Sequence, residues 1–205
     1  MPCLKSVFLA TMSHELRTPM TIIKSYLWML QSGKYGELNE KQRYYMNTAM
    51  NSTDRLIALV NDMLNISRVE QGLMEFKIEP TDILKEIETV MEFLRNSTNE
   101  KSLSLTIGIE KGLDNPMVMV DKDRFKEILL NLLNNSIKFT HTGGIEIKLT
   151  SENDSSIKVS IVDTGIGISK RDLSALFKKF GRLDNSFTKV AEAGGTGLGL
   201  HIVKL

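Results

Sequence analysis

The hydrophobic pattern of this 205-residue chain is purely helical before Gly72 and mixed after it. Before Gly72, apolar residues recur at spacings of three and four over residues 5–32 and again over residues 40–68, which is typical of amphipathic helices. After Gly72, short segments alternate between apolar and polar residues, which is typical of half-buried strands. The pattern therefore predicts an all-α helical hairpin in residues 1–71, followed by an α/β sandwich in residues 72–205.

Both predicted helices carry an apolar stripe, and the second stripe is too wide for one partner helix to cover. Gly33 and Gly36 separate the helices, and Asn39 with Gln42 forms a capping pair at the start of the second helix. Burying one leucine or isoleucine is worth about 1.5–3 kcal/mol, so we expect two hairpins to pair as a homodimer, in a dimeric four-helix bundle. The stripes consist of Leu9, Met12, Leu16, Met20, Ile23, Leu27 and Leu30, and of Tyr45, Ala49, Ser52, Leu56, Leu59, Met63 and Ile66.

His14 lies almost opposite the apolar stripe of the first helix, so its side chain is expected to face water. Thr18 lies one turn further along the same face, because side chains four residues apart stack on a helix surface. Glu15 adjoins both residues. An imidazole, a carboxylate and a hydroxyl are thus predicted to share one accessible patch.

Strands and helices are mixed in the second half of the chain. Alternating segments at 103–109, 145–149 and 157–161 predict strands, and helical patterns cover 82–96 and 123–139. We expect one face of a sheet to be covered by these helices.

The helix predicted at 123–139 has an unusual polar side, made by Glu127, Asn131, Asn135 and Lys138. Asparagine is a poor helix former, so these residues reduce helix stability. Amide oxygens can ligate a hard cation, and a nearby lysine can neutralise phosphate. An ordinary solvated helix face is the alternative interpretation.

Two glycine-rich segments, 163–168 and 194–200, follow a predicted strand and precede a helical pattern, respectively. Glycine lets backbone N–H groups approach phosphate closely. Neither segment has the spacing of a dinucleotide-binding fingerprint or a P-loop. Plain flexible loops remain the alternative for either segment taken alone.

Taken together, these motifs resemble the five sequence boxes of sensor histidine kinases, in the order of that family. The H box lies at His14, Glu15, Thr18 and Pro19, the N box at 131–140, the G1 box at 163–168, the F box at 177–182 and the G2 box at 195–200. The resemblance implies a dimerisation and histidine phosphotransfer domain in residues 1–71. It also implies a catalytic ATP-binding domain of the Bergerat fold in residues 72–205. Because relatives continue past the helix after the G2 box, this second domain is expected to be truncated at its C-terminus.

The resemblance also implies an activity, namely ATP-dependent phosphorylation of His14 followed by phosphoryl transfer to a partner. Glu15 would act as the general base, and Thr18 would position a water molecule in a reverse, phosphatase reaction. The implied cofactors are ATP and Mg²⁺, with Asn135 as the magnesium ligand and Asn131 as a further candidate.

Further roles in nucleotide binding follow from the same resemblance. Asp163 would accept the exocyclic amine of adenine, Phe139 would pack near the base, and Arg182 would contact the γ-phosphate. The implied nucleotide-binding residues are Asn131, Asn135, Lys138, Phe139, Asp163, Gly165, Gly167, Phe180, Arg182, Gly195, Thr196, Gly197, Leu198 and Gly199.

Phosphohistidine is an intermediate, so a recipient is required. No receiver-like acidic cluster fits within this chain, and the expected partner is the receiver domain of a response regulator, acting in trans. Two alternatives stay open. A Bergerat-fold ATPase would need a carboxylate base where this chain has Asn131, and an amide cannot accept that proton. A catalytically silent dimeric scaffold would bind nucleotide without phosphorylation of His14.

Composition excludes other partners. The chain has 26 basic and 25 acidic residues and a formal net charge of +1, so no overall field attracts nucleic acid. No apolar run approaches the roughly 20 residues that cross a bilayer, and we expect no membrane segment in this chain. Cys3 is the only cysteine, which fits a reducing compartment. We therefore expect a cytoplasmic location, although a longer parent protein could carry a membrane anchor upstream.

Overall fold

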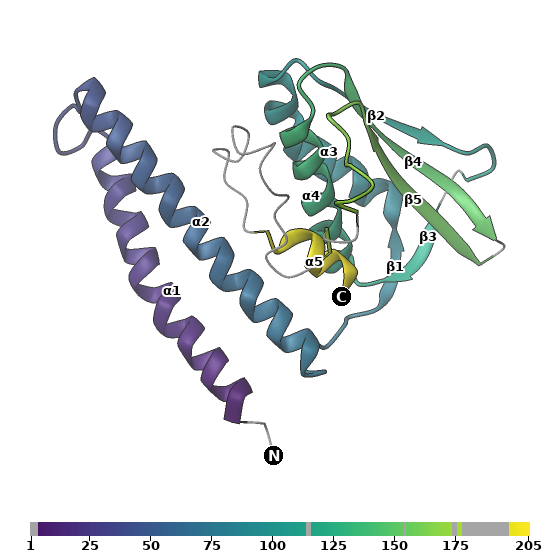
Figure 1. Ribbon diagram of the computed structural model, residues 1–205, viewed down its shortest axis with the longest axis horizontal. Coiled ribbons are helices and arrows are strands. Elements are labelled where there is room, and N and C mark those ends of the chain that lie inside the picture. The colour runs from purple at the N-terminus through teal and green to yellow at the C-terminus, as the bar shows by residue number, and fades with distance from the viewer. Residues whose placement is uncertain (1–3, 114–115, 154, 174–175, 178–196) are drawn as a thin grey trace. The chain divides into compact units, whose positions relative to one another are not determined.

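The computed structural model describes residues 4–113, 116–153, 155–173, 176–177 and 197–205, with side chains from Glu15 onward (Figure 1). Contacts between residues divide the described chain into two compact units. One unit contains residues up to 74 together with 197–205, and the other contains residues from 75 to 177. None of the described helices is long and apolar enough to span a membrane.

The first unit is built on a hairpin of two long helices, α1 (Leu4–Gln31) and α2 (Glu40–Glu70). A capping box starts α2, because the Asn39 side chain accepts a hydrogen bond from the Gln42 N–H and the Gln42 side chain accepts one from the Asn39 N–H, each at 2.9 Å. Gly72, with a positive φ of 65°, closes the other end of α2. The predicted helices and the predicted ends of α2 are therefore confirmed. A short helix, α5 (Gly199–Lys204), packs against α2 in this unit.

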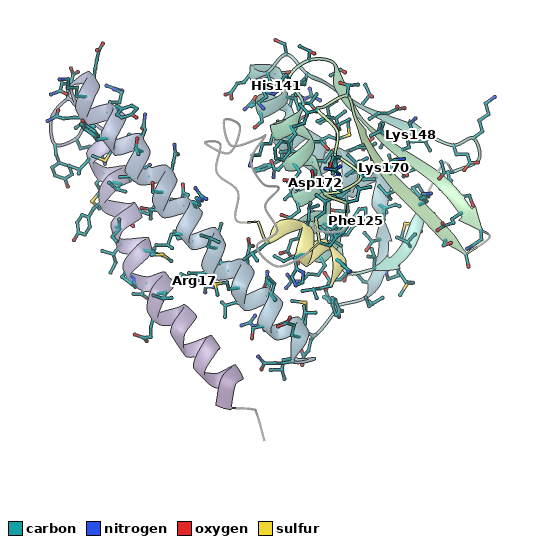
Figure 2. All side chains as sticks on the ribbon, in the orientation of Figure 1. Arg17, Phe125, His141, Lys148, Lys170 and Asp172 are labelled. Atoms are coloured by element: carbon teal, nitrogen blue, oxygen red, sulfur yellow. The ribbon has the colours of Figure 1, made fainter. Side chains whose placement is uncertain are left out.

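Three polar pairs set the register of α1 against α2. Arg17, labelled in Figure 2, donates from its guanidinium to a side-chain oxygen on α2, and similar pairs follow it along the hairpin. The pairs are Arg17–Asn61 (2.8 Å), Lys24–Asp54 (2.6 Å) and Gln31–Asn47 (3.0 Å). Successive pairs are seven residues apart on both helices, so they form a ladder along one side of the two antiparallel helices. We call these three pairs the polar ladder.

The apolar stripe of α1 is only partly buried within one chain. Met20 is buried and Leu27 is half-buried, whereas Leu16, Ile23 and Leu30 are exposed. The stripe of α2 is divided in the same way, with Ile66 buried and Tyr45, Leu56 and Met63 exposed. One neighbouring helix covers only one side of each stripe, which is why the predicted seam is not fully buried in the single chain.

The second unit has two sheets and two long helices. Strands β1 and β3 form an antiparallel pair, and the other sheet has the order β2-β4-β5, in which β2 and β4 are parallel and β4 and β5 antiparallel. Its elements are β1 (Glu79–Asp82), α3 (Ile83–Glu100), β2 (Ser104–Ile109), β3 (Met117–Val120), α4 (Lys122–Phe139), β4 (Gly144–Asn153) and β5 (Ser156–Asp163). The predicted fold class, a helical hairpin followed by an α/β unit, is confirmed.

Two strands of this unit were not predicted from the sequence, β1 and β3. Both are only four residues long, and β1 contains Pro80. A run of four residues is too short to establish an alternating pattern, and proline cannot donate a hydrogen bond within a sheet. The two strands pair with each other rather than with β2, β4 or β5.

Figure 1 shows α3 and α4 on the same face of the three-stranded sheet. The core between helices and sheet is formed by buried aliphatic residues, namely Ile83, Ile87, Val90 and Leu94 of α3, Leu129, Leu133 and Ile137 of α4, and Ile145, Ile147 and Leu149 of β4. The opposite face of β4 carries charged residues, including an ion pair of 3.2 Å between Glu146 and Lys148. Lys148 is labelled in Figure 2. The helices thus cover one sheet face, as the sequence predicted.

Glu86 connects the two helices of this layer. Its carboxylate is almost completely buried and lies 2.8 Å from the Lys122 ammonium and 3.4 Å from that of Lys126, both on α4. Burial raises the pKa of the Glu86 carboxyl, but the two lysines outweigh burial and hold the pKa below its usual range. The carboxylate is therefore charged at neutral pH and links α3 to the N-terminal half of α4.

Candidate functional site: the α4–β5 region

Helix α4 carries four of the residues expected to bind nucleotide. Asn131, Asn135, Lys138 and Phe139 are all half-buried. Among the described residues, neither asparagine has a side-chain hydrogen-bond partner. The Lys138 ammonium lies 5.0 Å from the centre of the Phe139 ring. The helix therefore presents two amides without side-chain partners among the described residues, together with a nearby lysine, on a half-buried surface.

Both ends of α4 are held in place by side chains from other elements or the preceding loop. At the start, the Asp121 carboxylate accepts hydrogen bonds from the backbone N–H groups of Arg124 (3.0 Å) and Lys77 (2.9 Å). These bonds hold the pKa of Asp121 below its usual range. At the other end, the Lys101 ammonium donates to the carbonyl of Ile137 at 2.7 Å. This cation stabilises the last turn, where carbonyls lack partners within the helix.

Asp163, at the end of β5, lies against the same helix. Its Oδ1 accepts a hydrogen bond from the Gly165 N–H at 2.9 Å, and its Oδ2 accepts one from the Ser136 hydroxyl at 3.1 Å. Asp163 is exposed, whereas Ser136 is buried. Each carboxylate oxygen has two lone pairs, so each retains the capacity to accept a further hydrogen bond from a ligand.

Gly165 approaches the end of α4 too closely for any larger residue. A Cβ atom at this position would lie 2.7 Å from the carbonyl oxygen of Phe139, 2.8 Å from Asp163 Oδ1 and 3.0 Å from Thr140 Oγ1. The Ile166 N–H also donates to the Phe139 carbonyl, at 3.2 Å. Absence of a Cβ atom therefore allows this segment to pack directly on the C-terminal turn of α4.

Thr164 fixes the same segment to the loop that precedes β4. Its hydroxyl donates to the Thr142 carbonyl at 2.9 Å and accepts from the Gly144 N–H at 3.0 Å, and its own N–H donates to the Gly144 carbonyl at 3.1 Å. Three hydrogen bonds thus hold the start of the glycine-rich segment. The position of Asp163 is well defined as a result.

The Thr140 hydroxyl is the unusual polar atom of this region. Thr140 is fully buried, and its Oγ1 has no hydrogen-bond partner among the described residues. A buried hydroxyl without a partner costs free energy, so the Thr140 hydroxyl is suited to a further hydrogen bond. The described residues contain no group of three or more His, Cys, Asp or Glu side chains suited to a metal ion. The chemistry of the region is therefore that of amides, hydroxyls, one lysine and the carboxylate of Asp163.

The H box lies in the other unit, in the middle of α1. The backbone of His14 is helical, and its side chain lies outside the part that the structure describes. Glu15 and Thr18 are exposed, as the helical spacing predicted. α1 continues as one helix through Pro19, which cannot donate to the carbonyl of Glu15.

The remaining nucleotide-binding predictions fall on the last part of the chain. Phe180, Arg182, Gly195 and Thr196 lie outside the described residues. Gly197, Leu198 and Gly199 are described, and their contacts place them in the unit that contains the hairpin. Gly167, in the segment after β5, has a positive φ of 69°. The structure therefore brings Asn131, Asn135, Lys138, Phe139, Asp163, Gly165 and Gly167 into one unit, and the role of the G2 box stays a prediction.

Ser136 and Thr140 were not singled out from the sequence. Both belong to the stretch that resembles the N box, but helical spacing places Ser136 on the same side as Leu129 and Leu133, where an apolar residue is expected. A serine on an otherwise apolar helix face could have drawn attention in the sequence, because a buried serine needs a hydrogen-bond partner.

The chain is similar to known proteins over almost its whole length. Residues 4–72 match the model of the His Kinase A (phospho-acceptor) domain, and residues 120–205 match that of the histidine kinase-, DNA gyrase B- and HSP90-like ATPases. The chain is 38% identical to the sensor histidine kinase GacS of Pseudomonas protegens, with 98% of the chain and 22% of GacS covered. It is 40% identical to the autoinducer 2 sensor kinase/phosphatase LuxQ of Vibrio cholerae, with 97% of the chain and 23% of LuxQ covered.

A solved structure gives the same result. The crystal structure of full-length ShkA in complex with AMPPNP matches with a TM-score of 0.77 and 30% identity, covering 96% of this chain and 39% of ShkA. The chain spans about a quarter of the length of GacS and of LuxQ. Fold, site and family models together define a protein that joins a phospho-acceptor hairpin to an ATPase-type domain. The chain belongs to the sensor histidine kinases.

Proposed function

We propose that the chain transfers the γ-phosphoryl group of ATP to His14 and then to an aspartate of a response-regulator receiver domain. The observation that carries this proposal is the arrangement at the end of β5. There, an exposed carboxylate, Asp163, is held by two donors beside a buried Thr140 hydroxyl that has no hydrogen-bond partner in the described part of the chain. This set of groups fits the edge of a purine base with an exocyclic amine, because a carboxylate accepts from an amine and a hydroxyl can both donate and accept.

The polar side of α4 fits the phosphate end of the same ligand. Asn135, with Asn131 as a second candidate, offers amide oxygens that suit Mg²⁺, and Lys138 offers a positive charge for a phosphate oxygen. Mg²⁺, when bound, would neutralise part of the negative charge of the phosphates. Phe139 would contact the base from the last turn of the helix. Gly165 and Gly167 would let the backbone approach the nucleotide. The other nucleotide-binding residues implied by the family resemblance, namely Phe180, Arg182, Gly195, Thr196, Gly197, Leu198 and Gly199, remain predictions from the sequence.

The reaction at the hairpin follows from the chemistry of imidazole. One nitrogen of neutral His14 forms a bond to the γ-phosphorus, while the bond from that phosphorus to the bridging oxygen breaks and ADP leaves. The proton on the other nitrogen passes to Glu15, which stands next to it in α1. The phosphoryl group then moves to a carboxylate oxygen of the receiver domain.

Thr18 supports a reverse activity on the same surface. Its exposed position, one turn after His14, would let its hydroxyl orient a water molecule toward a phosphorylated aspartate of the docked receiver domain. The name of LuxQ as a kinase/phosphatase is in line with such a second activity. We also propose that the functional unit is a homodimer, since Leu16, Ile23 and Leu30 are exposed along one stripe, and that it acts in the cytoplasm.

The decisive experiment is incubation of the purified chain with γ-labelled ATP and Mg²⁺. We expect a phosphoryl label that is labile in acid and stable in alkali, and that is absent from His14→Gln. Ser25→Ala, on the same helix, serves as the control and should be labelled normally. Nucleotide binding without any label would support a silent scaffold, and release of inorganic phosphate without label would support a simple ATPase. Either result would overturn the proposal.

A further inference from the structure

Ser136 is a buried hydroxyl on a helix face that is otherwise aliphatic. Leu129, Leu133 and Ile137 of α4 pack into the core on the same side. Burying a hydroxyl among such residues costs free energy unless it is hydrogen-bonded. The hydrogen bond that the structure gives this hydroxyl leads to Asp163 Oδ2, at 3.1 Å. The burial of Ser136 therefore depends on the group proposed to recognise the base.

The two donors to Asp163 act on different oxygens and differ in kind. The Gly165 N–H, on Oδ1, belongs to the backbone and lies only two residues further along the chain. The Ser136 hydroxyl, on Oδ2, comes from α4, 27 residues away. A carboxylate held at one oxygen can still turn about that contact, whereas one held at both oxygens keeps a single plane. Ser136 therefore restricts the orientation in which Asp163 can accept a hydrogen bond.

We propose that Ser136 is a positioning residue that sets the selectivity of the site for adenine. By donating to Oδ2, it holds the Asp163 carboxylate in the plane in which this group accepts the exocyclic amine of the base. The proposal rests on the proposed function, because it requires that ATP binds beside Asp163. The affinity of the site for the exocyclic amine then depends on Ser136, whose side chain does not itself contact the nucleotide.

Loss of the hydroxyl should therefore weaken only the interaction with the amine. Ser136→Ala leaves Asp163 and its bond to Gly165 in place, and alanine is well tolerated inside a helix. We expect the Kd for ATP to rise about tenfold. The Kd for purine riboside triphosphate, which lacks the exocyclic amine but is otherwise the same, should change less than about twofold. The kcat of autophosphorylation at saturating ATP should stay near that of the unaltered chain, since the phosphate end of the site is unchanged.

The test measures both nucleotides by calorimetry on the unaltered full chain, on Ser136→Ala and on Ser160→Ala. Ser160 is the matched control, because it lies on β5 near Asp163 but pairs in register with Lys148 on the sheet face opposite the helices. The selective loss described above, absent from Ser160→Ala, supports the proposal. Equal losses for both nucleotides would indicate a general structural effect and overturn it, as would an unchanged affinity for ATP.

The same measurements separate this proposal from the proposed function. If the unaltered chain binds neither nucleotide, the proposed function and this inference both fail. If the unaltered chain binds ATP more tightly than purine riboside triphosphate, and Ser136→Ala keeps that preference in full, only the inference fails. Thermal unfolding of each variant shows whether Ser136→Ala is folded, and its binding of purine riboside triphosphate reports on the rest of the site.

Discussion

At the scale of single residues, the α4–β5 region depends on one close approach between backbone segments. Gly165 lies where a Cβ atom would be 2.7 Å from the Phe139 carbonyl oxygen, and the backbone there cannot move aside easily. Gly108, on β2, has a different environment. A Cβ atom at that position would meet only the end of the Glu146 side chain, at 3.2 Å, and a flexible side chain can adjust. The two glycines therefore form a matched pair for mutagenesis.

We predict that Gly165→Ala lowers the free energy of unfolding by about 1–3 kcal/mol, as is usual for overpacking, and strongly weakens ATP binding. Gly108→Ala should change the free energy of unfolding by less than about 0.5 kcal/mol, because the added methyl group would meet a flexible side chain and not a fixed backbone carbonyl. Urea unfolding and nucleotide titration check both variants. Similar stability and affinity in the two variants would show that the close approach at Gly165 has no functional importance.

The sequence contained part of this site but not all of it. Asn131, Asn135 and Asp163 stand out because asparagine is rare inside helices and because an aspartate directly precedes a glycine-rich segment. Ser136 does not stand out, since its role depends on a partner 27 residues away that only the folded chain brings near. The same holds for Thr140, because its burial and the absence of a hydrogen-bond partner for its hydroxyl among the described residues become visible only in the folded chain. Local patterns in a single sequence do not show which distant segments will lie side by side in the folded chain.

At the scale of elements, the long helices were predicted closely and the short strands were not. The helix expected over 5–32 is Leu4–Gln31, and the one expected over 123–139 is Lys122–Phe139. A period of three to four residues repeated over many turns leaves little ambiguity. β1 and β3, by contrast, pair only with each other, and four residues carry too little pattern for detection. The C-terminal part of α3 also extends beyond the predicted end, to Glu100.

The contact between α3 and α4 should depend on pH through Glu86. Its pKa in the folded chain lies below the usual value of 4.5, so the folded state binds this proton less readily than the unfolded state. The charged carboxylate therefore adds stability above about pH 4.5, and this contribution is lost as the pH falls through the lower pKa of the folded state.

We predict that Glu86→Gln lowers the free energy of unfolding at pH 7 by about 1.5 kcal/mol, the lower end for hydrogen bonds to charged groups, because both lysines are partly exposed. The difference between the variant and the unaltered chain should shrink as the pH falls below the usual carboxyl pKa of 4.5. Urea unfolding across this pH range provides the measurement. Glu92→Gln is the control, since its ion pair with Arg95 is exposed and should contribute little. A constant difference between Glu86→Gln and the unaltered chain at all pH values would contradict the assignment.

At the scale of the whole molecule, the exposed stripe of the hairpin argues for a second copy of the chain. Ile23 and Ile22 are adjacent, of the same type and almost equally exposed, at 50% and 51%. Their side chains differ in the direction in which they point from the helix, because neighbouring residues in a helix are about 100° apart around its axis. Ile23 belongs to the apolar stripe with Leu16 and Leu30, whereas Ile22 lies outside it.

We predict that Ile23→Glu weakens dimerisation at least about a hundredfold. Two isoleucines would be lost per dimer, and burial of each is worth about 1.5–3 kcal/mol. Ile22→Glu should leave the dissociation constant of the dimer nearly unchanged. Analytical ultracentrifugation over a range of concentrations measures both. Equal effects of the two substitutions, or a monomeric unaltered chain, would refute the proposed arrangement of the bundle.

The polar ladder limits how the two helices of the hairpin can move. A slide of α1 along α2 by a single helical turn, about 5.4 Å, would separate all three pairs at once, because their spacing is the same on both helices. Each exposed pair is worth at most about 1 kcal/mol, but the three are broken together by such a slide. Piston-like displacement within one hairpin is therefore disfavoured, and a mechanical stimulus arriving at α1 would reach its far end with α2 carried along.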